Sequence, residues 1–126
     1  MKKKDFGELA ESLAAQKLEA QGYRIRDRNW RTIEGELDIV AQEDDTIVFV
    51  EVKARRSRQF GLPEEALTRK KRGRLIKAAL AYLELYKIQE VNWRFDLIAI
   101  ECSSRGELMR FEHLVDVIEA DPGEFF

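Results

Sequence analysis

The feature that most constrains this chain is a pair of alternating segments, residues 36–42 and 46–53, with Asp44 and Asp45 between them. Apolar side chains recur at every second position, which is typical of β-strands with one buried face. Adjacent acidic residues favour a tight turn, so the two segments predict a β-hairpin. One face of this hairpin is expected to be wholly apolar and to consist of Leu37, Ile39, Ala41, Val48, Val50 and Val52.

The register of this hairpin predicts a cluster of charge. A two-residue loop would place Asp38 directly opposite Glu51. The same register sets Glu36 opposite Lys53, and directly opposed residues share one face of a sheet. Two facing carboxylates repel each other unless water or a cation lies between them, and oxygen ligands suit Mg²⁺ or Mn²⁺. A solvated strand face with one cross-strand ion pair is the plainer alternative.

The rest of the chain predicts two helices and three more strands. Helical spacing of apolar residues predicts helices over residues 5–21, with Asp5 as cap, and from the cap Thr68 to about Tyr86. Strands are expected over residues 23–29, 93–101 and 108–113, with a turn over 30–35. The order α-β-β-β-α-β-β predicts an α/β domain with a mixed β-sheet flanked by helices. A length of 126 residues fits a single domain, residues 1–126.

The distribution of charge points toward nucleic acid, although the total does not. The chain carries 22 basic and 24 acidic residues, a balance that alone argues against a nucleic-acid partner. Residues 53–77, however, contain ten basic and two acidic residues. Such a block suits the phosphate backbone of DNA. Its first members after Lys53 are Arg55, Arg56 and Arg58. Arg31 is a further candidate contact, because it flanks Trp30, which is either a core residue or a stacking platform.

The sequence lacks the residues that several other classes of function require. One cysteine, Cys102, and one histidine, His113, exclude an internal disulfide framework and leave almost nothing for zinc or Ser-His-Asp chemistry. No apolar run approaches the roughly 18 residues of a membrane span, and no secretory signal is evident, so we expect a cytoplasmic protein without a membrane partner. Asp96, on a buried strand, is expected to pair with an arginine such as Arg94 or Arg74 rather than to act as a third metal ligand.

The chain resembles a known family over about residues 6–118. Asp38 followed by Glu51-Val52-Lys53 is similar to the signature of the PD-(D/E)XK nuclease superfamily. A wider set of motifs resembles the bacterial YraN-like family, which is related distantly to archaeal Holliday junction resolvases. These motifs are Ala10-Glu11-x-x-Ala14, Gly22-Tyr23, Arg28-Asn29-Trp30-Arg31, Gly35-Glu36-Leu37-Asp38, Val48-Phe49-Val50-Glu51-Val52-Lys53, Phe60-Gly61, Lys70 and Arg94-Phe95-Asp96.

The resemblance implies a restriction-endonuclease-like core and a set of residue roles. Asp38 and Glu51 would bind Mg²⁺ (or Mn²⁺), and Lys53 would be the catalytic lysine. Glu11 would be the superfamily's helix-borne acid, which helps to position water. The resemblance also implies that Glu36 is an additional acid of the site and that Lys70 contacts phosphate.

The function expected on these grounds is a metal-dependent endonuclease that hydrolyses phosphodiester bonds in DNA, with branched DNA as a candidate substrate. Two alternatives stay open. One is a catalytically silent nucleic-acid-binding module, and the other is a protein-interaction domain in a DNA-processing assembly. The resolvase relatives act as dimers, but no self-complementary patch is evident here, so a homodimer also stays open.

Overall fold

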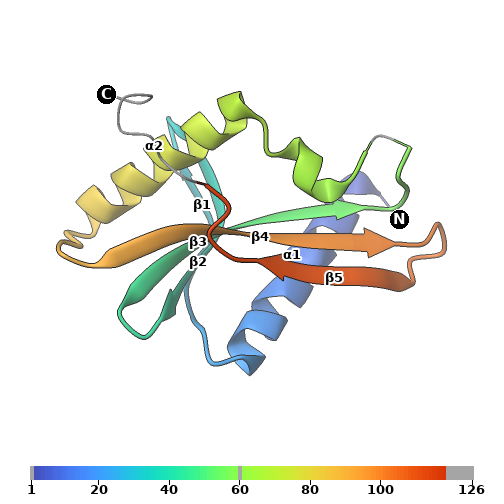
Figure 1. Cartoon of the computed structure of the whole chain (residues 1–126), viewed down its shortest axis with the longest axis horizontal. Coiled ribbons are helices and arrows are strands. Elements are labelled where there is room, and N and C mark those ends of the chain that lie inside the picture. The colour runs from blue at the N-terminus through green and yellow to red at the C-terminus, as the bar shows by residue number, and fades with distance from the viewer. Residues whose placement is uncertain (1, 60, 119–126) are drawn as a thin grey trace.

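The computed structural model describes residues 2–59 and 61–118, which form a five-stranded β-sheet with a long helix against each face (Figure 1). The elements in chain order are α1 (Lys3–Ala20), β1 (Arg24–Thr32), β2 (Gly35–Glu43), β3 (Thr46–Arg55), the short 3₁₀ helix η1 (Pro63–Ala66), α2 (Arg69–Leu85), β4 (Asn92–Cys102) and β5 (Leu108–Leu114). The predicted α/β class and the order α-β-β-β-α-β-β are confirmed, and they are consistent with a restriction-endonuclease-like fold. In the described ranges, no helix is both long and apolar enough to cross a membrane.

The strands lie in the sheet in the order in which they occur along the chain, β1-β2-β3-β4-β5. Neighbouring strands are antiparallel except β3 and β4, which are parallel. Parallel neighbours need a crossover, and the segment with η1 and α2 supplies it. This connection carries the basic end of α2 across the sheet face on which the side chain of Glu51 lies.

The two faces of the sheet bury different side chains. α1 packs small residues, Ala10, Ala14 and Ala15, against one face, where the partners from the sheet include Ile39 and Val50. α2 covers the other face, and its buried residues Leu75, Ile76, Ala78, Ala79, Tyr82 and Leu83 pack against Leu37, Val40, Ile47, Phe49 and Phe95. A strand that is buried on both faces reads as nearly continuous apolar sequence, which explains why Phe49 and Val40 interrupt the polar side of the predicted hairpin.

The ends of the helices test the predicted caps. Thr68 caps α2 as predicted, because its Oγ1 accepts a hydrogen bond from the Lys71 backbone nitrogen at 3.3 Å. The predicted Asp5 cap is wrong. α1 begins two residues earlier, so Asp5 lies within its first turn and Lys2 is at the N-cap position without a side-chain capping bond.

The predicted turn over residues 30–35 is shorter than expected. β1 continues to Thr32, which pairs with Gly35, so the turn consists of residues 33 and 34. The extension exists because Trp30 belongs to the core. Its ring packs edge-on against Tyr82 with ring centroids 5.2 Å apart.

Asp96 lies in a buried polar cluster on β4. Its Oδ1 accepts a hydrogen bond from Arg94 Nε at 3.0 Å, which confirms the predicted pairing with arginine. His113 Nε2 lies 2.7 Å from Asp96 Oδ2, and the Asp116 backbone nitrogen donates to Oδ1 at 3.0 Å. Burial alone would raise the pKa of Asp96, but these hydrogen bonds hold that pKa below its ordinary value. The carboxylate is thus fully used in joining β4 to β5 and to the segment that follows β5.

Candidate functional site

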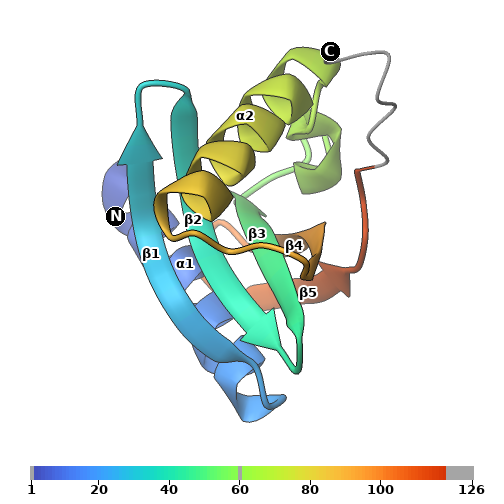
Figure 2. The same ribbon diagram turned by 90° about the vertical axis from the view of Figure 1, so that its left-hand side faces the viewer.

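A cleft of about 490 Å³ opens between the β1–β2 turn and the first turns of α2. Figure 2 shows both of these segments at the same end of the molecule. The residues that line the cleft are Gly35, Glu36, Asp38, Glu51, Lys53, Thr68, Lys70, Lys71, Arg74 and Leu75. The structure therefore brings together the four ionisable residues of the predicted hairpin cluster and places the basic start of α2 opposite them.

The predicted two-residue loop and its register are confirmed, but the pairing of β2 with β3 stops before it reaches the acids. β2 and β3 pair from Glu43–Thr46 as far as Ile39–Val50, and the pairing does not extend to Asp38 and Glu51. Instead, the Val52 backbone nitrogen donates a hydrogen bond to Asp38 Oδ2 at 2.9 Å. The carboxylate thus satisfies a strand amide that has no partner in the β2–β3 ladder, and the predicted direct opposition of Asp38 to Glu51 is wrong.

The predicted wholly apolar face is wrong at one position for the same reason. Leu37 packs with the α2 side of the core, whereas Ile39 packs with the α1 side. Strict alternation would put both on one face, so the alternation breaks between them. The β2–β3 pairing also ends before Glu36 and Lys53, and on its other side Glu36 pairs with Arg31 of β1. Alternation still holds from Asp38 to Val40, so the side chain of Asp38 lies on the same face as Glu51, as predicted.

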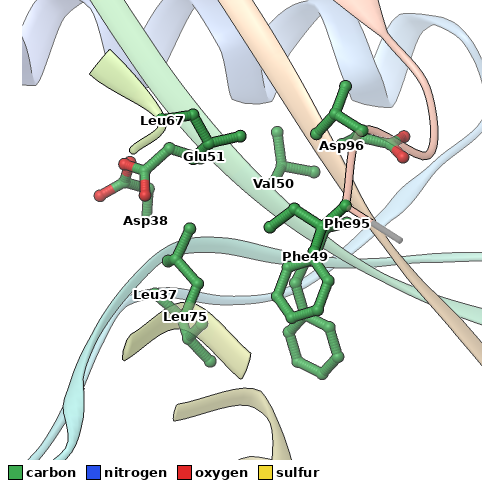
Figure 3. Close-up of a pocket in the computed structure, with 11 residues that line it drawn as sticks. Leu37, Asp38, Phe49, Val50, Glu51, Leu67, Leu75, Phe95 and Asp96 are labelled. Carbon is green, nitrogen blue, oxygen red and sulfur yellow. The ribbon is translucent and has the colours of Figure 1, made fainter. Parts of the chain in front are cut away.

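Asp38 and Glu51 form a pair of carboxyl groups in contact. Figure 3 shows their oxygens together, next to the apolar side chains Leu37, Leu67 and Leu75. Glu51 is only 8% exposed. Burial, and then the hydrogen bond and the negative charge of Asp38, raise the pKa of Glu51 to about 9. The Asp38–Glu51 pair therefore retains a proton to a higher pH than an ordinary glutamate does.

Two lysines face this carboxyl pair. Lys53 Nζ lies 3.9 Å from Glu51 Oε1, as expected for a residue two positions along the same strand. Lys71, in the first turn of α2, is half-buried, and burial together with its contact with Lys53 lowers its pKa. Lys71 was not among the predicted residues. Helical spacing could have identified it, because Lys71 lies four positions before Leu75, which is buried, and therefore lies on the inner face of the helix.

A second acidic group lies beside the first. Burial, followed by the negative charges of Asp38 and Glu36, raises the pKa of Glu11 on α1 to about 7. The side-chain nitrogen of Asn29, with its amide oriented to suit its partners, donates to Glu11 Oε1 at 2.9 Å and to Glu36 Oε1 at 3.3 Å. Asn29 has a positive φ of 51°, a conformation that asparagine tolerates better than most residues. Asn29 thus joins α1, β1 and β2, and no pattern in the sequence indicated that role.

The predicted basic residues occupy three different surroundings. Lys70 lines the cleft itself. Arg55 and Arg56 line a neighbouring hollow of about 460 Å³ with Lys3 and Phe6, where the Arg56 guanidinium lies 4.8 Å from the centre of the Phe6 ring.

Arg58 and Arg31 already have acidic partners. Arg58 donates two hydrogen bonds to Glu101, at 2.8 and 3.2 Å. Arg31 is 76% exposed and lies 3.5 Å from Glu36. Phe60, part of one motif behind the resemblance, lies outside the described residues.

The chemistry of the donor set suits a hard divalent cation. Two carboxyl groups in contact need either a shared proton or a cation between them, and oxygen ligands favour Mg²⁺ or Mn²⁺. Within residues 2–59 and 61–118, no group of three or more His, Cys, Asp or Glu side chains is arranged to hold a metal ion. Asp38 and Glu51 are thus a two-carboxylate set, which is the number that Mg²⁺ commonly takes from a protein when substrate phosphate completes its shell.

Sequence comparison places this arrangement in a family. The model described as "Uncharacterised protein family UPF0102" matches residues 10–100, a range that includes Glu11, Asp38, Glu51 and Lys53. The chain is 44% identical over 113 residues to a UPF0102 protein of Syntrophus aciditrophicus, covering 90% of this chain and 87% of the relative. It is 47% identical over 116 residues to a UPF0102 protein of Geobacter sulfurreducens, covering 92% and 90% of the two chains. A UPF0102 protein of Myxococcus xanthus is 39% identical over 118 residues, covering 94% and 92%. This chain belongs to the UPF0102 (YraN-like) family.

Proposed function

We propose that this protein is a metal-dependent endonuclease that hydrolyses phosphodiester bonds in DNA. The observation that carries the proposal is the contact between the carboxyl groups of Asp38 and Glu51 beside Lys53, at the base of a cleft with basic residues on its α2 wall. A contact between two acids is destabilising by itself, and strongly perturbed acids in a cleft are typical of functional sites.

Asp38 and Glu51 would hold Mg²⁺ or Mn²⁺, which supplies Lewis-acid activation of the phosphodiester when bound. Glu51 must release its proton to act as a ligand, and the neighbouring ammonium groups of Lys53 and Lys71 favour that release. The Asp38 oxygen that accepts from the Val52 nitrogen fixes the orientation of the carboxylate relative to β3.

The remaining residues of the site would handle the charge of the substrate and a proton. Lys53 and Lys71 would face the phosphate group and offset the negative charge that develops on it during hydrolysis. Glu11, with a pKa of about 7, is suited to orient the attacking water and accept its proton near neutral pH. Lys70 and Arg55 would neutralise phosphates on either side of the scissile bond.

The proposal is tested by incubating the protein with end-labelled duplex, single-stranded and four-way-junction DNA in Mn²⁺ or Mg²⁺. We expect cleavage of at least one substrate that chelation by EDTA abolishes. A protein that binds these DNAs with a steep salt dependence but never cuts them is instead a silent nucleic-acid-binding module. The basic wall of the cleft favours DNA binding in either case.

A further inference from the structure

The turn between β1 and β2 carries an apolar residue where tight turns usually carry polar ones. Thr32 pairs with Gly35, so Ile33 and Glu34 form a two-residue loop, and Ile33 is 100% exposed. The β2–β3 hairpin, by contrast, turns through Asp44 and Asp45, with Asp44 at a positive φ of 50°. Such turns favour Asn, Asp and Gly for their backbone conformations. A fully exposed isoleucine gains nothing from burial, so stability of the fold does not account for it.

This turn is part of the wall of the cleft. Gly35, which follows the loop directly, lines the cleft, and a Cβ added to it would lie 3.5 Å from the backbone oxygen of Arg74 on α2. The base of the turn is therefore packed against the helix that forms the opposite wall. Within the turn, the Glu34 backbone nitrogen donates to Thr32 Oγ1 at 3.2 Å. The side chain of Ile33 is thus fully exposed at the tip of a turn whose following residue, Gly35, lines the cleft.

The charge on the opposite wall of the cleft suits a polyanion. Glu34 and Glu36 flank the tip, and Arg31 lies 3.5 Å from Glu36, so the basic groups available to a polyanion here come from the other wall, where Lys70 and Arg74 line the cleft. Phosphate contacts at these positions would hold a DNA strand across the cleft, with Ile33 facing its bases.

We propose that Ile33 is a wedge that inserts beside unstacked bases and makes the protein prefer DNA with a branch point over continuous duplex. This inference rests on the proposed function. Insertion of an apolar side chain between base pairs costs the free energy of the stacking that it disrupts. At a branch point the stacking is already interrupted, so the same insertion costs less there and the contact favours branched DNA.

Other exposed apolar residues provide the matched control. Leu85, at the far end of α2, is 62% exposed and does not line the cleft. Isolated apolar residues are common on protein surfaces, so substitution of Leu85 measures the effect of losing one that has no role in DNA binding.

The test measures binding without divalent ions, so that cleavage plays no part. A four-way junction and a continuous duplex of matched sequence are titrated with wild type, Ile33→Ser, Ile33→Leu and Leu85→Ser. The junction carries 2-aminopurine beside its branch point as a reporter of unstacking. We expect Ile33→Ser to weaken junction binding by about tenfold and to abolish the fluorescence rise, while duplex binding changes less than twofold. Ile33→Leu and Leu85→Ser should resemble wild type.

Three outcomes would overturn the inference, and the first two leave the proposed function standing. If wild type binds and cuts DNA, but Ile33→Ser keeps the junction preference and the fluorescence rise, the wedge is wrong and the nuclease proposal stands. If Ile33→Ser and Leu85→Ser weaken binding to the junction and to the duplex equally, Ile33 has no specific role. If wild type binds neither DNA, both proposals fail together.

Discussion

The carboxylate of Asp38 accepts a hydrogen bond from the backbone nitrogen of Val52, 2.9 Å away, beyond the point where β2 and β3 cease to pair. The side chain of Asp38 thus supplies the hydrogen-bond acceptor that a paired strand would otherwise provide for this amide. The consequence is positional, because the bond ties Asp38 to β3 one residue away from Glu51. The two carboxyl groups are held together by the backbone itself rather than by flexible side chains alone.

This bond predicts a difference between two substitutions of Asp38. Asp38→Asn and Asp38→Ala both remove the charge, but only alanine also removes the acceptor for the Val52 nitrogen. We expect Asp38→Ala to be less stable than Asp38→Asn by about 1–3 kcal/mol, the cost of leaving a buried donor without a partner. Urea unfolding of both variants measures the difference. Equal stabilities would show that water or another group satisfies the Val52 nitrogen.

The pKa of Glu51 predicts how stability depends on pH. A carboxyl whose pKa rises from 4.5 in the unfolded chain to about 9 in the fold binds more protons when folded between these values. Its contribution to stability therefore falls as pH rises through that window. Glu51→Gln lacks this dependence and keeps a donor toward Asp38. The variant should gain stability over wild type from pH 5.5 to 8.5, by at most about 1.4 kcal/mol per pH unit. The free energies of unfolding of both proteins are measured in urea at each pH. If the two change with pH in parallel, the assignment of the raised pKa to Glu51 is wrong.

The same proton predicts how metal binding depends on pH. The Mn²⁺ affinity of wild type should rise with pH by up to about tenfold per unit below the pKa of Glu51, because the ligand must lose its proton. Calorimetric titrations at pH 6.5, 7.5 and 8.5, repeated in buffers of different ionisation enthalpy, measure the affinity and the number of protons released. Asp38→Asn should bind at least tenfold more weakly at each pH. Release of no proton, or unchanged binding by Asp38→Asn, would argue against a metal at this pair.

The environments of the basic residues predict unequal effects on DNA binding. Arg55→Ala and Lys70→Ala should each reduce the slope of log K against log salt by about 1, as expected for loss of one phosphate contact. Arg58 is already bonded twice to Glu101, so Arg58→Ala should change the slope less. Arg105, in the turn between β4 and β5, is the control and should have no effect. A slope that none of these substitutions changes would remove the case for this DNA-binding surface.

The sequence predicted the elements well where side chains alternate or repeat at helical spacing. Val48, Val50 and Val52 revealed β3, and Thr68 marked the start of α2, because both signals arise from residues adjacent in the chain. Leu37 was assigned to the wrong face, because its place depends on an interruption of the β2–β3 ladder. No local pattern records that interruption, which depends on the bond from the Val52 nitrogen to Asp38.

The site was predictable in part for a related reason. Asp38, Glu51 and Lys53 lie on one hairpin, so the predicted hairpin placed them near one another even though the ladder ends before Asp38. Lys71 comes from a helix that crosses the sheet, and Asn29 acts through a positive φ that its neighbours do not indicate. Their roles depend on how α2 and β1 pack, and the sequence of either segment alone does not determine that packing.

The most direct test of the account is the rate of DNA cleavage by wild type, Glu51→Gln and Lys53→Ala under single-turnover conditions in Mn²⁺. Thermal unfolding should first establish that all three proteins are folded. We predict cleavage by wild type and a loss of at least about 10³-fold in each variant, because each lacks a group that acts on the reacting phosphate. Cleavage that continues at the wild-type rate in either variant, or no cleavage by wild type of any DNA tested, would contradict the proposed role of the Asp38–Glu51 site.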